Sequence, residues 1–219
     1  MKIAVYTSIT SGKDVLKTPA HRDGIDLVFF TDRPHRDRDS DWNIRPACGL
    51  FTDPRRNSRA PKILAHQYLA DYDYSLWLDG SMRLLVPVRP LIDEFLADAD
   101  IATFAHAERD CIYEEAAVCA QRNLDDVRVI AEQMDRYRSD RVSPHPLHHG
   151  LSECGVILRR HTKQIEAFNN AWWSEFCRHS CRDQLSFNFV LRSHEIRHAT
   201  FPGTLWKDSG IVVYEGHAR

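Results

Sequence analysis

One short segment constrains the fold of this chain more than any other. Residues 74–78 (YSLWL) form an apolar run with the length of a buried strand, and the polar residues 79–81 (DGS) end it abruptly. Residues 27–30 (LVFF) form a second unbroken apolar run, as a parallel strand covered on both faces requires. Such runs predict the core strands of an α/β sheet with polar residues at the strand ends.

Apolar runs alternate with helical patterns through the first half of the chain, which predicts an α/β fold with a mainly parallel central sheet and helices on both faces. We expect strands at residues 3–6, 27–30, 42–44, 76–78, 101–105, 155–158 and 211–214. We expect helices at residues 55–68, 91–97, 108–138 and 183–191, and another around Trp172. The charged residues 35–41 are typical of a solvated loop. Without repeats or linkers, residues 1–219 are expected to form one domain.

Composition narrows the function classes. The formal net charge is -2, so no global field favours nucleic acid or an anionic membrane. The six cysteines show no Cys-x-x-Cys spacing and no repeated spacing. This irregular distribution is typical of reduced thiols. The opening residues read as a strand and not as a signal peptide, and no run reaches the ~20 apolar residues of a transmembrane segment. These features predict a cytoplasmic protein.

Several familiar motifs are absent from the sequence. It has no Gly-rich dinucleotide fingerprint, no P-loop and no Gly-x-Ser-x-Gly elbow. The pair His148-His149 follows two prolines, so we expect it in an irregular surface loop and not as a metal-ligand pair.

Three polar groups follow predicted strands and should meet at one edge of a parallel sheet. They are Thr7, Asp32 and the segment Asp79-Gly80-Ser81. Ligands of open α/β sheets bind beyond the carboxyl ends of the strands. A single acid there is often only a turn or a cap, but three converging loops favour a site. Asp32 could accept hydrogen bonds from a base or a ribose, and Thr7 could contact a base or a pyrophosphate. Asp79 could bind a sugar hydroxyl or a cation.

Two further groups carry candidate chemistry. Arg59 and Lys62 share a helix face at i, i+3 spacing and suit a diphosphate, although a solvated helix face explains them equally well. The remaining candidates are polar residues of the kind that bind carbohydrate hydroxyls, namely His106, Arg109, Tyr113, Glu114, Glu153, Asp183 and Gln184. Asp183 also stands where an acid simply favours a helix N-terminus.

Taken in order, these stretches resemble the glycosyltransferase-like domain of the plant turgor-regulation-defect and mucilage-related family. The resemblance covers most of the chain and includes residues 29–32 (FFTD), 59–62 (RAPK), 74–80 (YSLWLDG), 106–115, 150–161 and 180–187. It implies a GT-A-like, single-domain α/β/α sandwich similar to nucleotide-diphospho-sugar transferases. It also implies transfer of a sugar from a nucleotide donor, UDP-linked, to an unidentified acceptor hydroxyl.

The resemblance also assigns residues. Asp79 stands at the family's strand-end aspartate, Arg59 and Lys62 match its basic helix, and Asp183 and Gln184 match the acidic element beside the acceptor. Ser81 stands where an Asp-x-Asp element would have its second acid. A divalent ion, Mn²⁺ or Mg²⁺, is therefore either absent or held by Asp79 with a distant histidine such as His198.

The mechanism stays open at this point. An inverting transfer needs a general base, with Asp183 or Glu153 as candidates, whereas a retaining transfer could dispense with one. Two other functions compete with transfer. One is a binding module that kept the fold and lost turnover. The other is a metal-dependent hydrolase built on Asp79, Asp183 and histidines.

Overall fold

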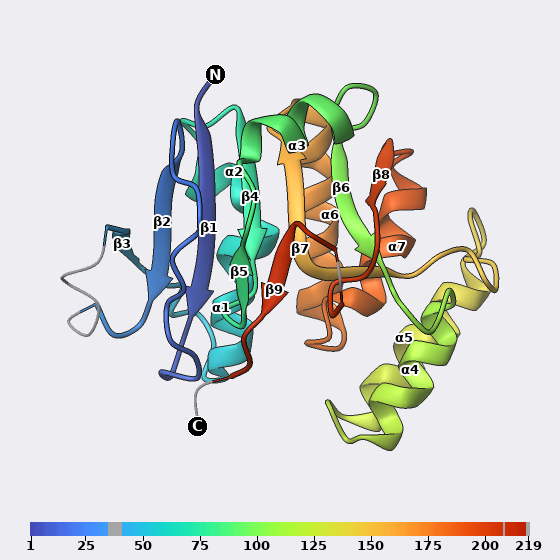
Figure 1. Ribbon diagram of the computed structural model, residues 1–219. Helices are drawn as coiled ribbons and strands as arrows, with labels where there is room; N and C mark the ends of the chain where they lie inside the picture. Colours follow the sequence, from blue (N-terminus) through green and yellow to red (C-terminus); the bar gives the residue numbers. More distant parts are fainter. Residues whose placement is uncertain (35–40, 208, 218–219) are drawn as a thin grey trace.

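A mixed seven-stranded sheet forms the centre of the protein (Figure 1), seen here in a computed structural model that describes residues 1–34, 41–207 and 209–217. Its order is β3-β2-β1-β4-β7-β6-β8. The strands are β1 (Ile3–Ile9), β2 (Asp26–Thr31), β3 (Asn43–Pro46), β4 (Tyr74–Leu78), β6 (Ile101–Ala105), β7 (Ser152–Arg160) and β8 (His198–Phe201). Neighbouring strands are parallel except where β7 pairs with β4 and β6. The predicted α/β fold with a mainly parallel sheet is confirmed.

Two apolar cores lie on the two faces of this sheet. Along β1, Ala4 and Tyr6 enter one core and Ile3 and Val5 enter the other, as the alternation of a strand requires. Helices supply the first core: α1 (Pro54–Ile63), α2 (Ala65–Tyr68), α4 (Ile112–Gln121), α5 (Val127–Ser139), α6 (Lys163–Arg178) and α7 (Gln184–Ser193). The second core is covered by α3 (Val88–Phe95) and by a two-stranded ribbon of β5 (Met82–Leu84) and β9 (Val212–Tyr214).

The expected single helix at residues 108–138 is wrong. Two helices, α4 and α5, form a hairpin that projects from one end of the sheet (Figure 1). Asn123 breaks the helix with a φ of 50°, a left-handed conformation that asparagine tolerates well. Asp126 then caps α5 by accepting a hydrogen bond from the Arg128 backbone N–H at 2.8 Å. The loop between the helices contacts the start of α1 and the segment before α7.

The helical pattern at residues 55–68 also divides in two. The Lys62 carbonyl accepts a hydrogen bond from the Tyr6 hydroxyl at 3.2 Å, and the Ile63 carbonyl accepts one from Arg159 Nη1 at 3.4 Å. The sheet thus supplies donors for these two carbonyls at the end of α1, and α2 begins after Leu64. This junction fixes Lys62 on the side of α1 that faces the sheet.

The C-terminal part differs from the expectation in its pairing. The predicted tail strand exists as β9, but it pairs with β5 outside the main sheet. Strands β5 and β8 were not predicted; they are short, and residues 82–84 (MRL) and 198–201 (HATF) do not form an unbroken apolar run. Of the charged segment 35–41, residues 35–40 lie outside the described part of the chain. No helix among the described residues combines the length and apolar character needed to cross a bilayer.

Candidate functional site

A cleft of about 270 Å³ opens at the edge of the sheet where β1 and β4 end. We call it the first cleft. It is lined by residues 8–11, 13–14, 54–55, 58–59, 77 and 79–81, together with Leu124, Cys181, Arg182 and His217. The predicted convergence of strand ends on one hollow therefore holds for the ends of β1 and β4. Arg55 and Arg59 bring positive charge to its wall.

Neither Asp32 nor Thr7 lines this cleft. Asp32 follows β2 and accepts from the backbone N–H of Ser11 through both carboxylate oxygens, at 3.0 and 2.9 Å. It therefore holds a lining loop and is not itself among the lining residues. Thr7 was expected in a loop, which is wrong, because β1 continues to Ile9 and Thr7 is buried within it. Thr10 and Ser11 line the cleft in its place.

A buried ion-pair network lies behind the cleft. Lys62 is 1% exposed, and its ammonium nitrogen lies 2.6 Å from Asp183 Oδ2 and 3.4 Å from Asp79 Oδ1. Arg59 Nε lies 3.2 Å from Asp183 Oδ1 and donates to it. Lys62 therefore does not lie on a solvated helix face, which was the alternative explanation for this residue. Arg59, a quarter exposed, is the member of the network that reaches the cleft together with Asp79.

Electrostatics keep this network ionised. Burial alone would raise the pKa of Asp183, but Lys62 and Arg59 outweigh burial and hold the pKa of that carboxyl well below its usual range. Burial alone would lower the pKa of the Arg59 guanidinium, but Asp183 and Asp79 outweigh burial and hold that pKa above the usual value. Asp183 is thus a carboxylate that stays charged at neutral pH and lies between two cations.

Packing fixes Asp79 closely. Its Oδ1 accepts from the Trp77 indole at 2.7 Å, and its backbone N–H donates to the Gly155 carbonyl at 2.8 Å. A Cβ on Gly155 would lie 2.6 Å from Leu205 Cδ2 and 3.6 Å from Asp79 Oδ2, so any larger residue at that position must displace the Leu205 side chain. Gly80 is similarly crowded, since a Cβ there would lie 2.9 Å from Asp14 Oδ2.

The donor set around Asp79 does not fit a divalent cation. Its Oδ1 is shared by an indole N–H and an ammonium group, and Ser81 replaces the second acid. His198 does not help, because it lies opposite Ile101 at the start of β6, whereas Asp79 follows the end of the parallel strand β4. Its Nε2 is hydrogen-bonded to Thr103 Oγ1 at 2.8 Å, and burial lowers its pKa to about 4.

One other group of potential metal ligands lies elsewhere. Within the described chain, Asp110, Glu114 and His148 are the three such residues whose ligand atoms gather within 4.8 Å. All three are exposed, as expected for His148, and none lines the first cleft. His148 Nδ1 is already hydrogen-bonded to Asp110 Oδ1 at 2.7 Å, which raises the pKa of the imidazole.

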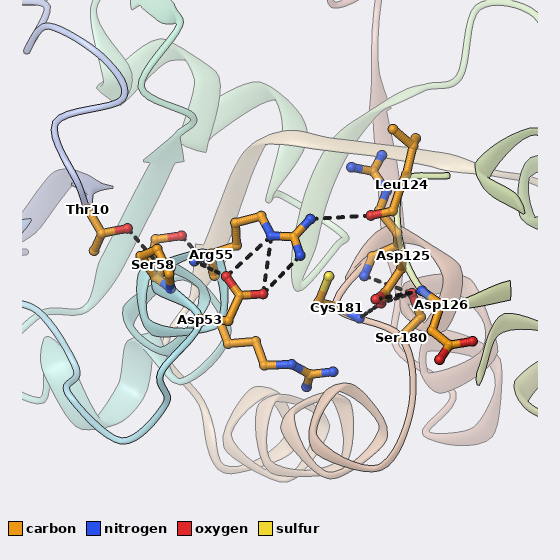
Figure 2. Close-up of polar contacts among 12 residues, drawn as sticks. Thr10, Asp53, Arg55, Ser58, Leu124, Asp125, Asp126, Ser180 and Cys181 are labelled. Carbon is orange, nitrogen blue, oxygen red and sulfur yellow. Dashed lines mark hydrogen bonds and ion pairs between the residues drawn. The ribbon is translucent and has the colours of Figure 1, made fainter. Parts of the chain in front are cut away.

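The outer wall of the first cleft is held by the loop between α4 and α5 (Figure 2). Arg55 extends from the start of α1 and donates to the Leu124 carbonyl at 3.4 Å. Asp125 accepts from the Ser180 hydroxyl at 2.8 Å and from the Cys181 backbone N–H at 2.6 Å. Burial would raise the pKa of Asp125, but these donors lower it, so the carboxylate stays charged and ties the two loops together.

A second cleft of about 330 Å³ adjoins the first. It is lined by residues 106–109, 115, 118, 122, 124, 153, 182, 184 and 206. Leu124 and Arg182 line both clefts and so mark the boundary between them. Arg182 keeps a buried Nε that has no hydrogen-bond partner among the described residues.

The second cleft contains a compact polar cluster. Glu153 Oε1 accepts from the Trp206 indole at 3.1 Å and lies 3.5 Å from His106 Nε2. Arg109 Nε donates to Glu115 Oε2 at 2.9 Å. Glu153 reaches this edge because β7 runs antiparallel to its neighbours, so that the start of β7 meets the end of β6. Gln184 lies beside the cluster and donates from Nε2 to the Ser152 carbonyl at 2.9 Å.

Tyr113 and Glu114, which the sequence offered as carbohydrate-binding residues, line neither cleft. The Tyr113 hydroxyl donates to the His145 carbonyl at 2.7 Å in a buried position, and the Glu114 side chain is half exposed near His148. Helix α4 turns Glu115, and not Glu114, toward Arg109. Sequence reasoning also did not identify Leu124 and Trp206 as lining residues. No local pattern distinguishes either of them.

Comparisons with known proteins identify the family of this chain. The sequence model of the TOD1/MUCI70 glycosyltransferase-like domain matches residues 44–209. The chain is 32% identical over 157 residues to "Probable hexosyltransferase MUCI70" of Arabidopsis thaliana, covering 68% of this chain and 27% of that protein. It is 28% identical over 178 residues to "Alkaline ceramidase TOD1" of the same plant, covering 76% of this chain and 38% of that protein.

Solved structures give the fold class. The WbbM bifunctional glycosyltransferase superimposes with a TM-score of 0.50 at 12% identity, over 92% of this chain and 39% of that one. Mouse xyloside xylosyltransferase 1 gives a TM-score of 0.48 at 10% identity, over 91% of this chain and 84% of that one.

The fold is therefore that of GT-A-like glycosyltransferases. Within this class, the chain belongs to the TOD1/MUCI70 family of glycosyltransferase-like domains. The chain spans well under half the length of the two curated relatives.

Proposed function

We propose that the chain transfers a sugar from a nucleotide-sugar donor, UDP-linked, to an acceptor hydroxyl. The observation that carries this proposal is the pair of adjoining clefts at the carboxyl edge of the sheet, with Arg59 in the first and Glu153 in the second. A transferase needs two substrates to meet at one point, and the shared residues Leu124 and Arg182 supply that point. The free thiols of all six cysteines are in keeping with a reducing compartment, the cytoplasm.

The donor is assigned to the first cleft. Its diphosphate lies against Arg59, with Arg55 and Arg182 as further cations within the same wall. Thr10 and Ser11, on the loop held by Asp32, are suited to the ribose and base. Lys62 is too buried to contact the donor, so its role is to hold Asp79 and Asp183 in place.

Catalysis then follows from charge and position. Departure of the nucleotide diphosphate builds negative charge, and preorganised guanidinium groups stabilise it without a divalent ion. The misfit of Asp79 as a metal ligand supports this metal-independent route. Holding the acceptor hydroxyl against the donor adds the advantage of proximity.

For an inverting transfer, we assign the general base to Glu153. Its carboxylate lines the second cleft, where an acceptor hydroxyl can reach it. Asp183 lines neither cleft, and the lowered pKa of its carboxyl makes it a weak proton acceptor. Glu153→Gln should therefore lower the transfer rate strongly and leave donor binding intact, whereas a retaining enzyme would tolerate it. Undiminished transfer by a folded Asp183→Asn variant would separately exclude Asp183 as the base.

The first test is a thermal-shift screen with UDP-, GDP-, CMP- and dTDP-sugars, with Mn²⁺ or with EDTA. A donor at a hundredfold excess over its Kd stabilises the folded state by ~2.7 kcal/mol. We expect UDP-sugars to raise the Tm equally in Mn²⁺ and EDTA, and donor hydrolysis to follow. Binding without hydrolysis or transfer would favour the binding module. If no nucleotide sugar shifts the Tm, the proposal fails.

A metal-dependent hydrolase is not supported by a specific observation. The name of one relative, an alkaline ceramidase, raises the possibility of hydrolysis. However, the exposed group at Asp110, Glu114 and His148 is separate from both clefts. Hydrolysis that requires added metal would reverse this preference.

A further inference from the structure

We propose that Trp206 is the platform on which the acceptor stacks, and that the acceptor presents a terminal pyranose to the second cleft. This inference rests on the proposed function, because only a transferase has an acceptor. The binding of a pyranose at Trp206 is a separate statement that can be tested by itself. It concerns one aromatic side chain on the segment between β8 and β9.

The exposure of Trp206 is unusual for this chain. Its relative exposure is 49%, whereas Trp42, Trp77 and Trp172 are buried. An indole left open to water usually has a reason when it lines a cleft. Here the remaining lining of the second cleft is largely charged or polar, and the indole is its largest apolar side chain.

The indole is also held in place. Its N–H donates to Glu153 at 3.1 Å, and Tyr214 packs against its ring with centroids 5.2 Å apart at an interplanar angle of 70°. The preceding residue, Leu205, is 2% exposed and packs against Gly155. An aromatic ring with its polar edge bonded and its chain anchored loses little entropy when a ligand stacks on it.

The surrounding chemistry matches a sugar. A pyranose has an apolar face of C–H groups and a rim of hydroxyls, which suits an indole face beside carboxylates and guanidinium groups. Glu153 and Glu115 accept hydrogen bonds, and Arg109 donates them. The three glutamates and three arginines lining the cleft balance, so an anionic ligand such as a phosphate gains no net attraction.

A nucleotide base is the alternative ligand for an exposed indole, and the experiment separates the two. The protein is labelled with 5-fluorotryptophan, and the Trp206 signal in the ¹⁹F NMR spectrum is assigned by its loss in Trp206→Phe. Methyl glycosides of glucose, galactose, mannose and xylose are titrated, and UDP is titrated separately. We expect at least one glycoside to shift the Trp206 signal and UDP to leave it unchanged.

Variants then test the energetic role. Trp206→Ala should weaken binding of that glycoside about tenfold, which corresponds to about 1.4 kcal/mol, and Trp206→Phe should weaken it less because a ring remains. Donor KM should stay at the wild-type value in both, because Trp206 does not line the first cleft. Trp173→Phe is the matched control, because Trp173 packs against Phe51 and Phe176 outside both clefts.

Three results would overturn the inference. They are a Trp206 signal that no glycoside moves, a Trp206 signal that UDP moves, and unchanged glycoside binding by a folded Trp206→Ala variant. Failure of the proposed function looks different, because the wild-type protein would then neither bind nor hydrolyse nucleotide sugars. The glycoside titration does not depend on turnover and remains decisive in that case.

Discussion

Replacing Lys62 with methionine tests the central electrostatic argument. The change keeps much of the apolar stem and removes the ammonium group that lies between Asp79 and Asp183. Removing one partner of a buried ion pair costs about 3–5 kcal/mol. Asp183 keeps Arg59 and Asp79 keeps the Trp77 indole, so neither carboxylate loses every partner. We therefore expect the lower limit, about 3 kcal/mol.

Urea and thermal unfolding measure this loss. For a domain of this size, each kcal/mol lowers the Tm by about 2–4 °C, so Lys62→Met should lower it by about 6–12 °C. Lys163→Met is the matched control, because the Lys163 side chain is 95% exposed and pairs only at the surface with Glu166. It should change stability by less than about 0.5 kcal/mol. A Lys62→Met variant that matches this control would refute the assignment of Lys62 as a buried structural cation.

The pH dependence gives an independent readout of the same contact. The pKa of Asp183 in the folded state lies below its unfolded value of about 3.9. Its contribution to stability is therefore fully present above that value and is lost as the pH falls below it. In Lys62→Met the pKa is less depressed, so the wild-type protein should lose more stability than the variant between about pH 5 and pH 2. Parallel pH profiles would contradict the coupling.

The remaining predictions concern the two clefts. Glu153→Gln should lower transfer by about 10²–10⁴-fold in a coupled assay while the Tm shift with UDP-sugar stays at the wild-type value; an unchanged rate would remove Glu153 as the base. Gly155→Ala should destabilise the protein by about 1–3 kcal/mol in urea unfolding, because the new Cβ would lie 2.6 Å from Leu205 Cδ2; wild-type stability would show that Leu205 moves freely. Tyr113→Phe should cost about 1 kcal/mol and leave both substrate KM values unchanged, because its hydroxyl bonds to the His145 carbonyl outside the clefts; a raised acceptor KM would return Tyr113 to the site. EDTA should not lower the transfer rate, and restoration by Mn²⁺ would refute the metal-independent route.

Periodicity and apolar runs were enough to predict a mainly parallel sheet and the edge of it at which the first cleft opens. Asp79 follows a strand whose Leu and Trp content marks it as buried, and the structure places it in the first cleft. The family resemblance confirmed by the comparisons adds the class of chemistry. Both inferences depend on local patterns, which a single sequence carries well.

Contacts between distant segments were not predictable in the same way. Glu114 and Glu115 are neighbours, and only the rotation of α4 decides which one meets Arg109. The buried position of Lys62 depends on Tyr6 and Arg159, which hold the end of α1 from the sheet. No spacing rule links these residues, because their contacts arise from packing between helix and sheet.

Packing around Gly155 also connects the two clefts. The Gly155 carbonyl accepts a hydrogen bond from the backbone N–H of Asp79 in the first cleft, and the bare Cα of Gly155 accommodates Leu205, the residue before Trp206 in the second. A shift of β7 at this position would therefore displace the Asp79 carboxylate and the proposed acceptor platform together. Close packing transmits such a shift because it leaves few voids to absorb it. Gly155→Ala should consequently raise the KM for both substrates, whereas Trp206→Ala should raise only that for the acceptor.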